Sequence, residues 1–247
     1  MTNSIGRAAF VARAGIVCAL LGLPSVAFAT PGTWTGFYIG ANGGYASDTM
    51  DIDGAPPPAG PPTQDMEGGL LGATVGFNWQ TGSPIVLGVE ADLAMVHMED
   101  TVRDGNYLVE GGEITSFGTV RARVGWSFGQ WLPYITAGYM WDEVEQSFSC
   151  PDSAAVPFGF CRPTAAGGHG APGGFNLKAS QTQTGFIWGG GVEFDIDGHW
   201  SVKIEDLVGE FDDQDYNLGP DGAGVDKLLT TQQTLDNLFR FGVNYRF

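Results

Sequence analysis

Apolar and polar residues alternate with a period of two along most of the chain beyond residue 30. Successive side chains of an extended strand point to opposite faces, so this alternation predicts β-strands with one apolar and one polar face. We expect eight of them, near residues 35–47, 67–80, 84–98, 113–128, 131–147, 181–196, 199–210 and 233–247. In the last strand one face carries Leu235, Phe239, Phe241, Val243, Tyr245 and Phe247, and the other carries Asp236, Arg240, Asn244 and Arg246.

The connections between these strands alternate in length. The long polar connections are 48–66, 99–112, 148–180 and 211–232, and the short ones are 81–83, 129–130 and 197–198. Long loops at one rim and tight turns at the other are typical of an outer-membrane barrel, whose short turns lie in the periplasm. The sequence therefore predicts an all-β protein, an eight-stranded antiparallel up-and-down transmembrane β-barrel.

Charges on the polar faces favour this barrel over a water-soluble sandwich, which would show the same alternation. Acids and bases occur at mid-strand depth in five of the predicted strands. An unpaired charge at that depth would be costly, so we expect these side chains to pair inside a narrow lumen. The predicted charge network consists of Glu90, Asp92, Arg121, Arg123, Glu193, Asp195, Lys203, Glu205, Arg240 and Arg246.

Large aromatic residues gather beside the predicted short-turn rim. Amphipathic rings favour the level of the lipid headgroups, so they form girdles around membrane barrels. The predicted periplasmic girdle consists of Trp34, Trp79, Trp126, Trp131, Trp200 and Phe247.

The start of the chain has the features of a cleaved export signal. Arg7 and Arg13 precede an apolar run at 15–23, which is too short for a membrane helix, and small residues follow at Ala27 and Ala29. We assign 1–29 to a signal peptide and 30–247 to one barrel domain, exported through the inner membrane to the outer membrane of a Gram-negative bacterium. The formal charge of −17 excludes nucleic acid as a partner, because phosphate binding needs clustered Lys and Arg.

Two cysteines remain once the signal is removed, and both lie in the longest predicted loop. Cys150 and Cys161 would meet an oxidising compartment, so we expect a disulfide between them. The role of that disulfide would be to restrain the loop, because redox chemistry favours a closer pair of cysteines.

Other candidates for chemistry are weak. His169 is a weak candidate for a haem ligand, against the alternative of a solvated loop histidine. An enzyme acting on lipid A could use His97 with Ser47, Ser147 or Ser180, but the spacing selects no triad. The acidic loops lack a recognised calcium spacing. We therefore predict no catalytic residue, no cofactor and no metal.

Three segments suggest a family. The opening segment 34–45 (WTGFYIGANGGY), the segment 88–92 (GVEAD) and the terminal segment 243–247 (VNYRF) resemble the small outer-membrane barrels of alphaproteobacteria, often labelled opacity-protein-like or "porin family" proteins. The resemblance implies that Phe247 is the assembly signal for the barrel-assembly machinery. It also implies roles in envelope integrity, host interaction and, in some members, haem binding. Asp206 departs from the pattern, because relatives usually carry an aromatic residue at that lipid-facing position.

From these observations we expect a structural and surface-interaction protein of the outer membrane without catalysis. Its partners would be outer-membrane lipids, lipopolysaccharide, the barrel-assembly machinery and surface or host ligands of the loops. A narrow pore or a haem-binding receptor is the alternative, and a lipid A-modifying enzyme is the third. Side chains fill the interior of an eight-stranded barrel, so free diffusion of solutes is not expected.

Overall fold

The computed structural model describes residues 33–53, 63–104 and 108–247, which lie in one compact unit, Pro31–Phe247. The predicted signal peptide, 1–29, lies outside these residues. In the part of the chain that the structure describes, no helix is long and apolar enough to cross a membrane.

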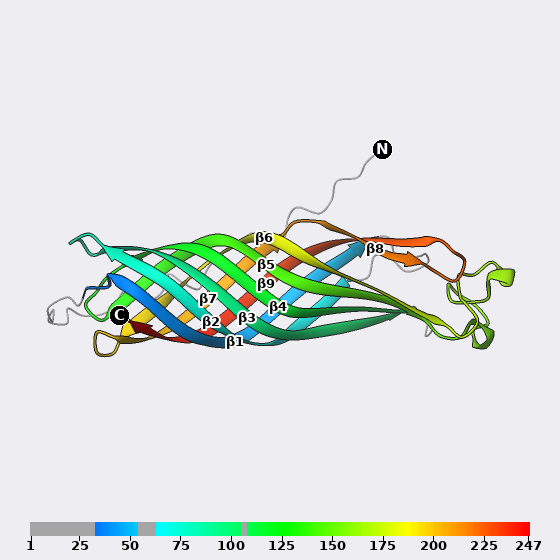
Figure 1. Cartoon of the computed structure of the whole chain (residues 1–247), viewed down its shortest axis with the longest axis horizontal. Coiled ribbons are helices and arrows are strands. Elements are labelled where there is room, and N and C mark those ends of the chain that lie inside the picture. Colours follow the sequence, from blue (N-terminus) through cyan, green and yellow to red (C-terminus); the bar gives the residue numbers. More distant parts are fainter. Residues whose placement is uncertain (1–32, 54–62, 105–107) are drawn as a thin grey trace, which may run out of the picture. The chain divides into compact units, whose positions relative to one another are not determined.

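The described residues form nine antiparallel strands and two short 3-10 helices (Figure 1). The strands are β1 (Gly36–Asp53), β2 (Thr63–Gln80), β3 (Ile85–Asp104), β4 (Leu108–Trp126), β5 (Trp131–Cys150), β6 (Phe175–Asp195), β7 (Trp200–Phe211), β8 (Gln214–Pro220) and β9 (Asp226–Arg246). The helices η1 (Ser153–Ala155) and η2 (Thr164–Ala166) lie in the longest loop.

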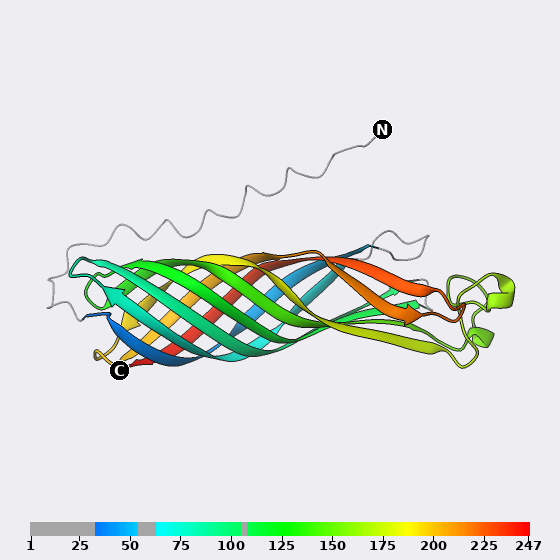
Figure 2. The same cartoon turned by 45° about the horizontal axis from the view of Figure 1, so that its top comes forward.

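Eight of the strands close into a ring. Each strand from β1 to β7 pairs with the next, β7 pairs with β9, and β9 pairs with β1. The strand β8 continues the line of β7 and pairs with β9 beyond it, and Figure 2 shows it lying beside the outer part of β9. The predicted eight-stranded antiparallel barrel is confirmed.

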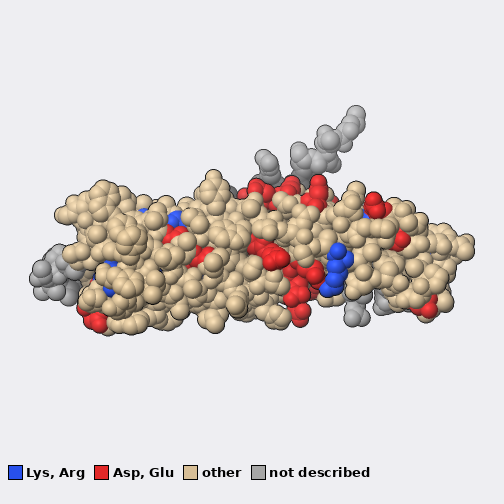
Figure 3. Space-filling model, in the orientation of Figure 1, with Lys and Arg blue, Asp and Glu red and all other residues tan. Residues whose placement is uncertain are grey.

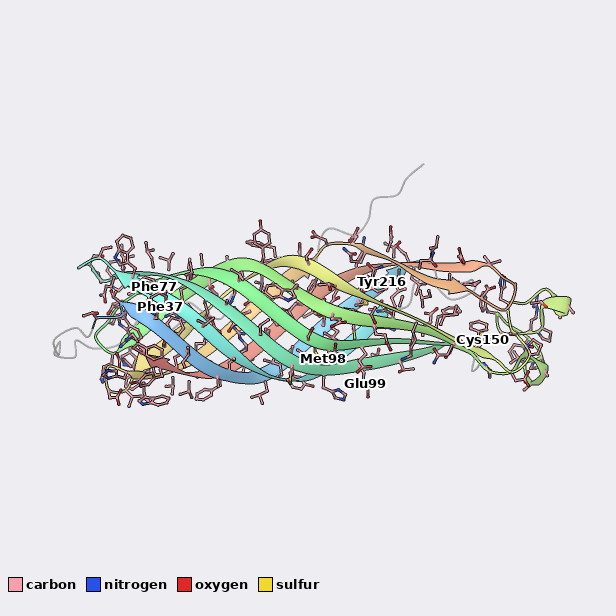
Figure 4. All side chains as sticks on the ribbon, viewed as in Figure 1. Phe37, Phe77, Met98, Glu99, Cys150 and Tyr216 are labelled. Carbon is pink, nitrogen blue, oxygen red and sulfur yellow. A yellow bond between two sulfur atoms is a disulfide. The ribbon has the colours of Figure 1, made fainter. Side chains whose placement is uncertain are left out.

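The outer wall near the short turns is apolar and exposed. Tight turns join the strands here, and in one of them Gly198 adopts a left-handed φ of 91° that favours glycine. Phe37 and Phe77 lie near this end of the barrel, with ring centroids 4.6 Å apart (Figure 4). The other exposed apolar side chains of this wall include Ile39, Leu71, Val75, Leu87, Val89, Leu93, Val120, Val124, Ile135, Ile204, Phe239 and Phe241. An exposed apolar wall of this kind is favourable in contact with lipid hydrocarbon and unfavourable in contact with water.

Seven of the eight predicted strands are longer than expected, always at the end away from the short turns, and β7 keeps its predicted length. β6 begins at Phe175 where we expected 181, and β9 begins at Asp226 where we expected 233. A 20-residue strand such as β5 extends about 66 Å, whereas about 10 tilted residues cross a membrane. Roughly half of each long strand therefore stands beyond the lipid, in segments that the polar composition had marked as loops.

The alternation of inner and outer faces is interrupted by bulges. In β9 the residue Asp236 has no partner across from β1, since Ser47 pairs with Asn237 and Asp48 pairs with Leu235. The extra residue reverses the two faces. Leu235 is therefore buried and Asp236 is exposed, which corrects their predicted placement. A similar shift in β4 lies between Ile114 and Ser116.

Candidate functional site

The interior of the barrel next to the apolar wall holds the charge network. Its centre is Arg121 of β4, whose side chain is fully buried. Arg121 Nη2 donates to Glu90 Oε1 (2.5 Å) and Asp92 Oδ2 (2.8 Å) of β3. Arg121 Nη1 donates to Glu205 Oε1 of β7 at 3.2 Å. One guanidinium thus links three carboxylates from two strands on different sides of the ring.

The remaining cations of the network pair with the same acids or with the next ones along the barrel. Lys203 Nζ donates to both oxygens of Glu90 at 2.8 Å, and Arg240 Nη2 donates to Glu205 Oε2 at 2.7 Å. Towards the short turns, Arg123 pairs with Glu193 at 2.7 Å and Arg246 pairs with Asp195 at 2.5 Å.

All ten residues of the predicted network are buried, and the structure brings them together as five acids facing five bases. The formal charge of the network is therefore zero. Paired charges of this kind fill the lumen with side chains and hold the strands in register across it.

Trp34 closes the short-turn mouth and is not part of the girdle, which corrects the prediction. It is 1% exposed and packs with Val86 and Leu132. Its Nε1 donates to Ser127 Oγ at 3.1 Å, and the guanidinium of Arg246 lies 5.0 Å from its ring. Trp34 precedes the first strand, so strand alternation does not determine its direction, and the chain turns inward there.

The other girdle residues face outward at the same end of the barrel. Trp79, Trp126, Trp131, Trp200 and Phe247 are between 46% and 72% exposed. Trp200 contacts Tyr245 edge-on at 5.0 Å, and Tyr245 contacts Phe247 at 5.3 Å.

The interior beyond the charge network is mostly apolar, with buried amides such as Gln64, Gln146 and Gln183 among the apolar side chains, and the sequence prediction missed this. Its buried side chains include Met50, Ile52, Met66, Ile114, Phe117, Val144, Phe148, Ile187, Leu207, Leu229, Leu235 and Leu238. The outer wall of the same strands carries many exposed acids, and acidic side chains gather on the middle of the face seen in Figure 3. The signal was present in the period-two spacing of Met50 and Ile52 inside a segment that its acids had marked as a loop.

Two buried aspartates lie where the apolar interior begins. Gln233 Nε2 donates both to Asp48 Oδ2 (2.9 Å) and to Asp142 Oδ2 (2.8 Å). Both aspartates line a small cavity of about 10 Å³ whose other walls are apolar. We refer to Asp48 and Asp142 as the aspartate pair.

The longest loop, 151–174, forms a lid at the far end of the barrel. Cys150 and Cys161 form a disulfide with Cα atoms 5.5 Å apart, and Figure 4 places Cys150 where β5 enters this loop. The ammonium of Lys227 lies 4.7 Å from the ring of Phe148 and 5.0 Å from that of Phe160. These cation–π contacts attach the lid to β5 and β9.

A histidine fixes the lid to the connection between β8 and β9. His169 stacks on Phe160 with ring centroids 4.5 Å apart, and its Nδ1 lies 2.7 Å from Asp221 Oδ2. Burial acts to raise the pKa of Asp221, but hydrogen bonds from the backbone N–H groups of Val225 and Ala223, together with His169, hold it below its ordinary value. The charged form of Asp221 is thus the form that the lid contact favours.

The residues considered for catalysis do not converge. His97 faces outward on β3, and among the described residues no hydrogen bond joins it to Ser47 of β1, Ser147 of β5 or Ser180 of β6. No group of three or more His, Cys, Asp or Glu side chains in the described ranges is arranged to hold a metal ion. His169 has a hydrogen-bonded partner at Nδ1, so any haem iron would have to bind at Nε2.

Known proteins resemble this chain over most of its length. The family profile described as "Outer membrane protein beta-barrel domain" matches residues 16–247. The 31 kDa outer-membrane immunogenic protein of Brucella melitensis is 27% identical over 226 residues, which cover 87% of this chain and 84% of that protein. The 22 kDa outer membrane protein of Rhizobium leguminosarum bv. viciae is 26% identical, over 87% of this chain and 79% of that protein.

Solved structures with similarity to the chain include the outer membrane protein OprG and the protein Ail. OprG from Pseudomonas aeruginosa has a TM-score of 0.47 and 12% identity, covering 86% of this chain and 96% of its own. Ail, the attachment invasion locus protein of Yersinia pestis, has a TM-score of 0.38 and 13% identity, covering 86% of this chain and 99% of its own.

Proposed function

This chain belongs to the outer membrane protein β-barrel domain family, and from that membership we propose that it stiffens the outer membrane and presents an acidic surface to the outside, without transport or catalysis. It is an outer-membrane β-barrel protein similar to alphaproteobacterial outer-membrane proteins. What we propose is its role there, which is to support the membrane mechanically and to interact at the cell surface.

The neutral, closed interior is the observation that carries the proposal. Five acids and five bases fill the section within the membrane, Trp34 covers one mouth, and the lid covers the other. A solute would have to break buried ion pairs to pass, and one broken pair costs about 3–5 kcal/mol. Such an interior supports rigidity of the barrel and opposes conduction.

The wall beyond the lipid supports the surface role. Its outward residues include Asp51, Asp65, Glu143, Glu210 and Asp215, all exposed. The Brucella relatives are named outer-membrane immunogenic proteins. We propose that the lid and this wall contact lipopolysaccharide and ligands outside the cell, and that Phe247, exposed at the chain end, is read by the barrel-assembly machinery.

Conductance in planar lipid bilayers tests the proposal. The mature protein, folded in detergent and checked by its heat-modifiable gel mobility, is expected to give no steady current, beside a general porin measured in the same membrane. A steady open pore in the wild type would contradict the proposal and favour transport. In cells, a deletion strain is expected to become more sensitive to detergent, and the wild-type gene is expected to restore resistance.

The two alternatives have separate measurements. A lipid A-modifying enzyme would change the mass of lipid A when the gene is expressed, and we expect no change. A haem receptor using His169 would show a Soret shift on titration with haem that His169→Ala abolishes. Either result would replace the proposed role with the corresponding activity.

A further inference from the structure

The wall of the barrel has a seam beyond the lipid, between β6 and β8. The pairing of β6 with β7 ends outward at Gly185, and the last backbone hydrogen bond across this edge runs from the N–H of Asp212 to the carbonyl oxygen of Thr184 at 2.8 Å. Further out, β6 pairs with β5 and β8 pairs with β9 (Figure 2). Among the described residues no strand pairs with the other edge of β6 from 175 to 183, or with the edge of β8 that faces it.

The contacts that cross the seam come from side chains. Gln181 Nε2 donates to the backbone oxygen of Asp215 at 2.8 Å, and Gln183 Nε2 donates to the hydroxyl of Tyr216 at 2.8 Å. Beyond Gln181, towards the lid, no hydrogen bond joins β6 to β8 in the part of the chain that the structure describes. Both strands therefore present backbone N–H and C=O groups that an added strand could pair with.

The exposure of the inner face of β6 changes at the same level. Inward residues such as Gln183 and Ile187 are buried, whereas the four inward residues further out are only half-buried. These four are Phe175, Leu177, Ala179 and Gln181. Every second residue of β5 from Val144 to Cys150, at the same height, is buried. The mostly apolar inner face of β6 is thus accessible from the seam.

The outer side of the seam is acidic. Asp212, Asp213 and Asp215 are exposed at the start of β8 and just before it. Their side-chain donors are hydroxyl and amide groups, and within the described ranges no cation pairs with them. The cation of the facing strand, Lys178, already pairs with Glu145. A strand that entered the seam would therefore meet apolar side chains on its inward face and carboxylates on its outward face.

We propose that the seam binds an extended peptide segment of a partner protein, in which apolar and basic residues alternate, by pairing with the free edge of β6. Strand addition of this kind takes its affinity from backbone hydrogen bonds and its specificity from alternate side chains. The apolar residues of the peptide would pack on Leu177 and Ala179, and its basic residues would face Asp213 and Asp215. The free edge of β6 is long enough for a strand of the usual length of about five to six residues.

The seam can open because β8 is held along one edge only, by β9. Entry of the peptide would replace the two glutamine contacts with backbone hydrogen bonds, which continue the sheet from β6. The inference goes beyond the proposed function, since the seam lies outside the charge network and peptide binding is measured separately from conductance.

The test uses the whole mature protein, folded in a non-ionic detergent, and a dye-labelled heptapeptide in which valine and lysine alternate. Fluorescence anisotropy measures the affinity, and amide hydrogen exchange locates the bound peptide. We expect saturable binding. Exchange is expected to slow in β6 from 175 to 183 and to stay unchanged in β1 and β2, which are paired on both edges.

Two control peptides separate backbone pairing from charge. In the first, proline replaces one inner valine, which removes a backbone donor and prevents continuous strand pairing. In the second, glutamate replaces every lysine, which opposes the peptide to the carboxylates of the seam. Both are expected to bind at least about tenfold more weakly than the alternating valine–lysine peptide.

Two double variants of the protein separate the seam from the rest of the acidic wall. Asp213→Asn with Asp215→Asn is expected to weaken binding about three- to tenfold, because two exposed ion pairs with the peptide are lost. Asp51→Asn with Asp65→Asn makes the same change of charge on β1 and β2, and is expected to leave the affinity unchanged. All four aspartates are exposed, so neither variant removes a buried contact of the barrel.

The inference is overturned if the alternating peptide shows no saturable binding at millimolar concentration, or if it binds without slowing exchange in β6. It is also overturned if the proline peptide binds as tightly as the valine–lysine peptide, because backbone pairing would then not contribute. Equal weakening by the two double variants would mean attraction to the acidic wall as a whole, with no role for the seam.

Discussion

Replacing Arg121 with methionine removes the cation that the largest number of buried carboxylates share. Arg121 donates to Glu90, Asp92 and Glu205, and its side chain has no exposed surface. Breaking a buried ion pair by removing one partner costs about 3–5 kcal/mol. All three acids keep a second cation, since Lys203 remains on Glu90 and Arg240 remains on the other two. We therefore expect the free energy of unfolding to fall by an amount at the lower end of this range, about 3 kcal/mol.

The assay is urea-induced unfolding of the barrel in lipid vesicles, followed by tryptophan fluorescence and by the heat-modifiable gel shift. The control is Lys178→Met, which removes the surface partner of Glu145. Those side chains are 52% and 32% exposed, so the expected loss is below about 1 kcal/mol.

A second substitution tests the electrostatic reason. Adding Glu90→Gln to Arg121→Met makes the network neutral again, and we expect it to recover 1 kcal/mol or more, on the order of a typical coupling energy. The reasoning is refuted if Arg121→Met costs no more than Lys178→Met. It is also refuted if the second substitution adds to the damage, because the cost would then come from packing and not from charge.

Three further predictions concern the two closed ends. Trp34→Ala is expected to lower the free energy of unfolding by about 3–5 kcal/mol, and Trp34→Phe by less, in the same urea assay. Replacing Cys150 and Cys161 with serine is expected to speed proteolytic cleavage within the lid, because the loop loses about 2–3 kcal/mol of restraint. Backbone hydrogen bonds from Val225 and Ala223, together with His169, lower the pKa of Asp221. The contact of the charged Asp221 with His169 therefore stabilises the lid above the ordinary aspartate range and is lost as the pH falls through the lowered value. Hydrogen exchange in the lid should rise at that acid pH, and Asp221→Asn should raise it at neutral pH.

The membrane-embedded part of the fold could be predicted from the sequence because one physical rule governs it. Each outward residue meets hydrocarbon and each inward residue meets the network, so the period-two pattern of β9 from Phe239 to Phe247 has one meaning throughout. The same rule identified the ten charges, because lipid excludes charge from the outer face.

The half of the barrel beyond the lipid could not be predicted in this way, because the polarity of its outer and inner faces is the reverse of that in the membrane-embedded half. Acids occupy the outer wall there and apolar residues occupy the interior, so composition alone marks β1 beyond Ser47 as a polar loop. The strand β8 was missed for the same reason, although Tyr216 and Leu218 alternate inward with polar neighbours. Trp34 was misplaced because no strand pattern extends to it.

The exchange of the two faces also locates the outer boundary of the hydrocarbon. The bulge at Asp236 turns a carboxylate outward, where Thr49 donates a hydrogen bond to it at 2.5 Å. Beside it, Asn237 Nδ2 donates to Asp206 Oδ1 at 2.7 Å. Asp206, the residue of β7 that departs from the family pattern, therefore has a polar partner. Below this level nine residues, Phe239 to the end of β9 at Arg246 and then Phe247, lead to the girdle. A tilted strand needs about 9–11 residues to cross a membrane, so the polar contacts of Asp206 and Asp236 lie where the lipid tails must end. Asp206 thus marks the outer edge of the lipid-facing surface of β7. An aromatic residue at its position would extend that surface to the next outward-facing position, about 7 Å further along the strand.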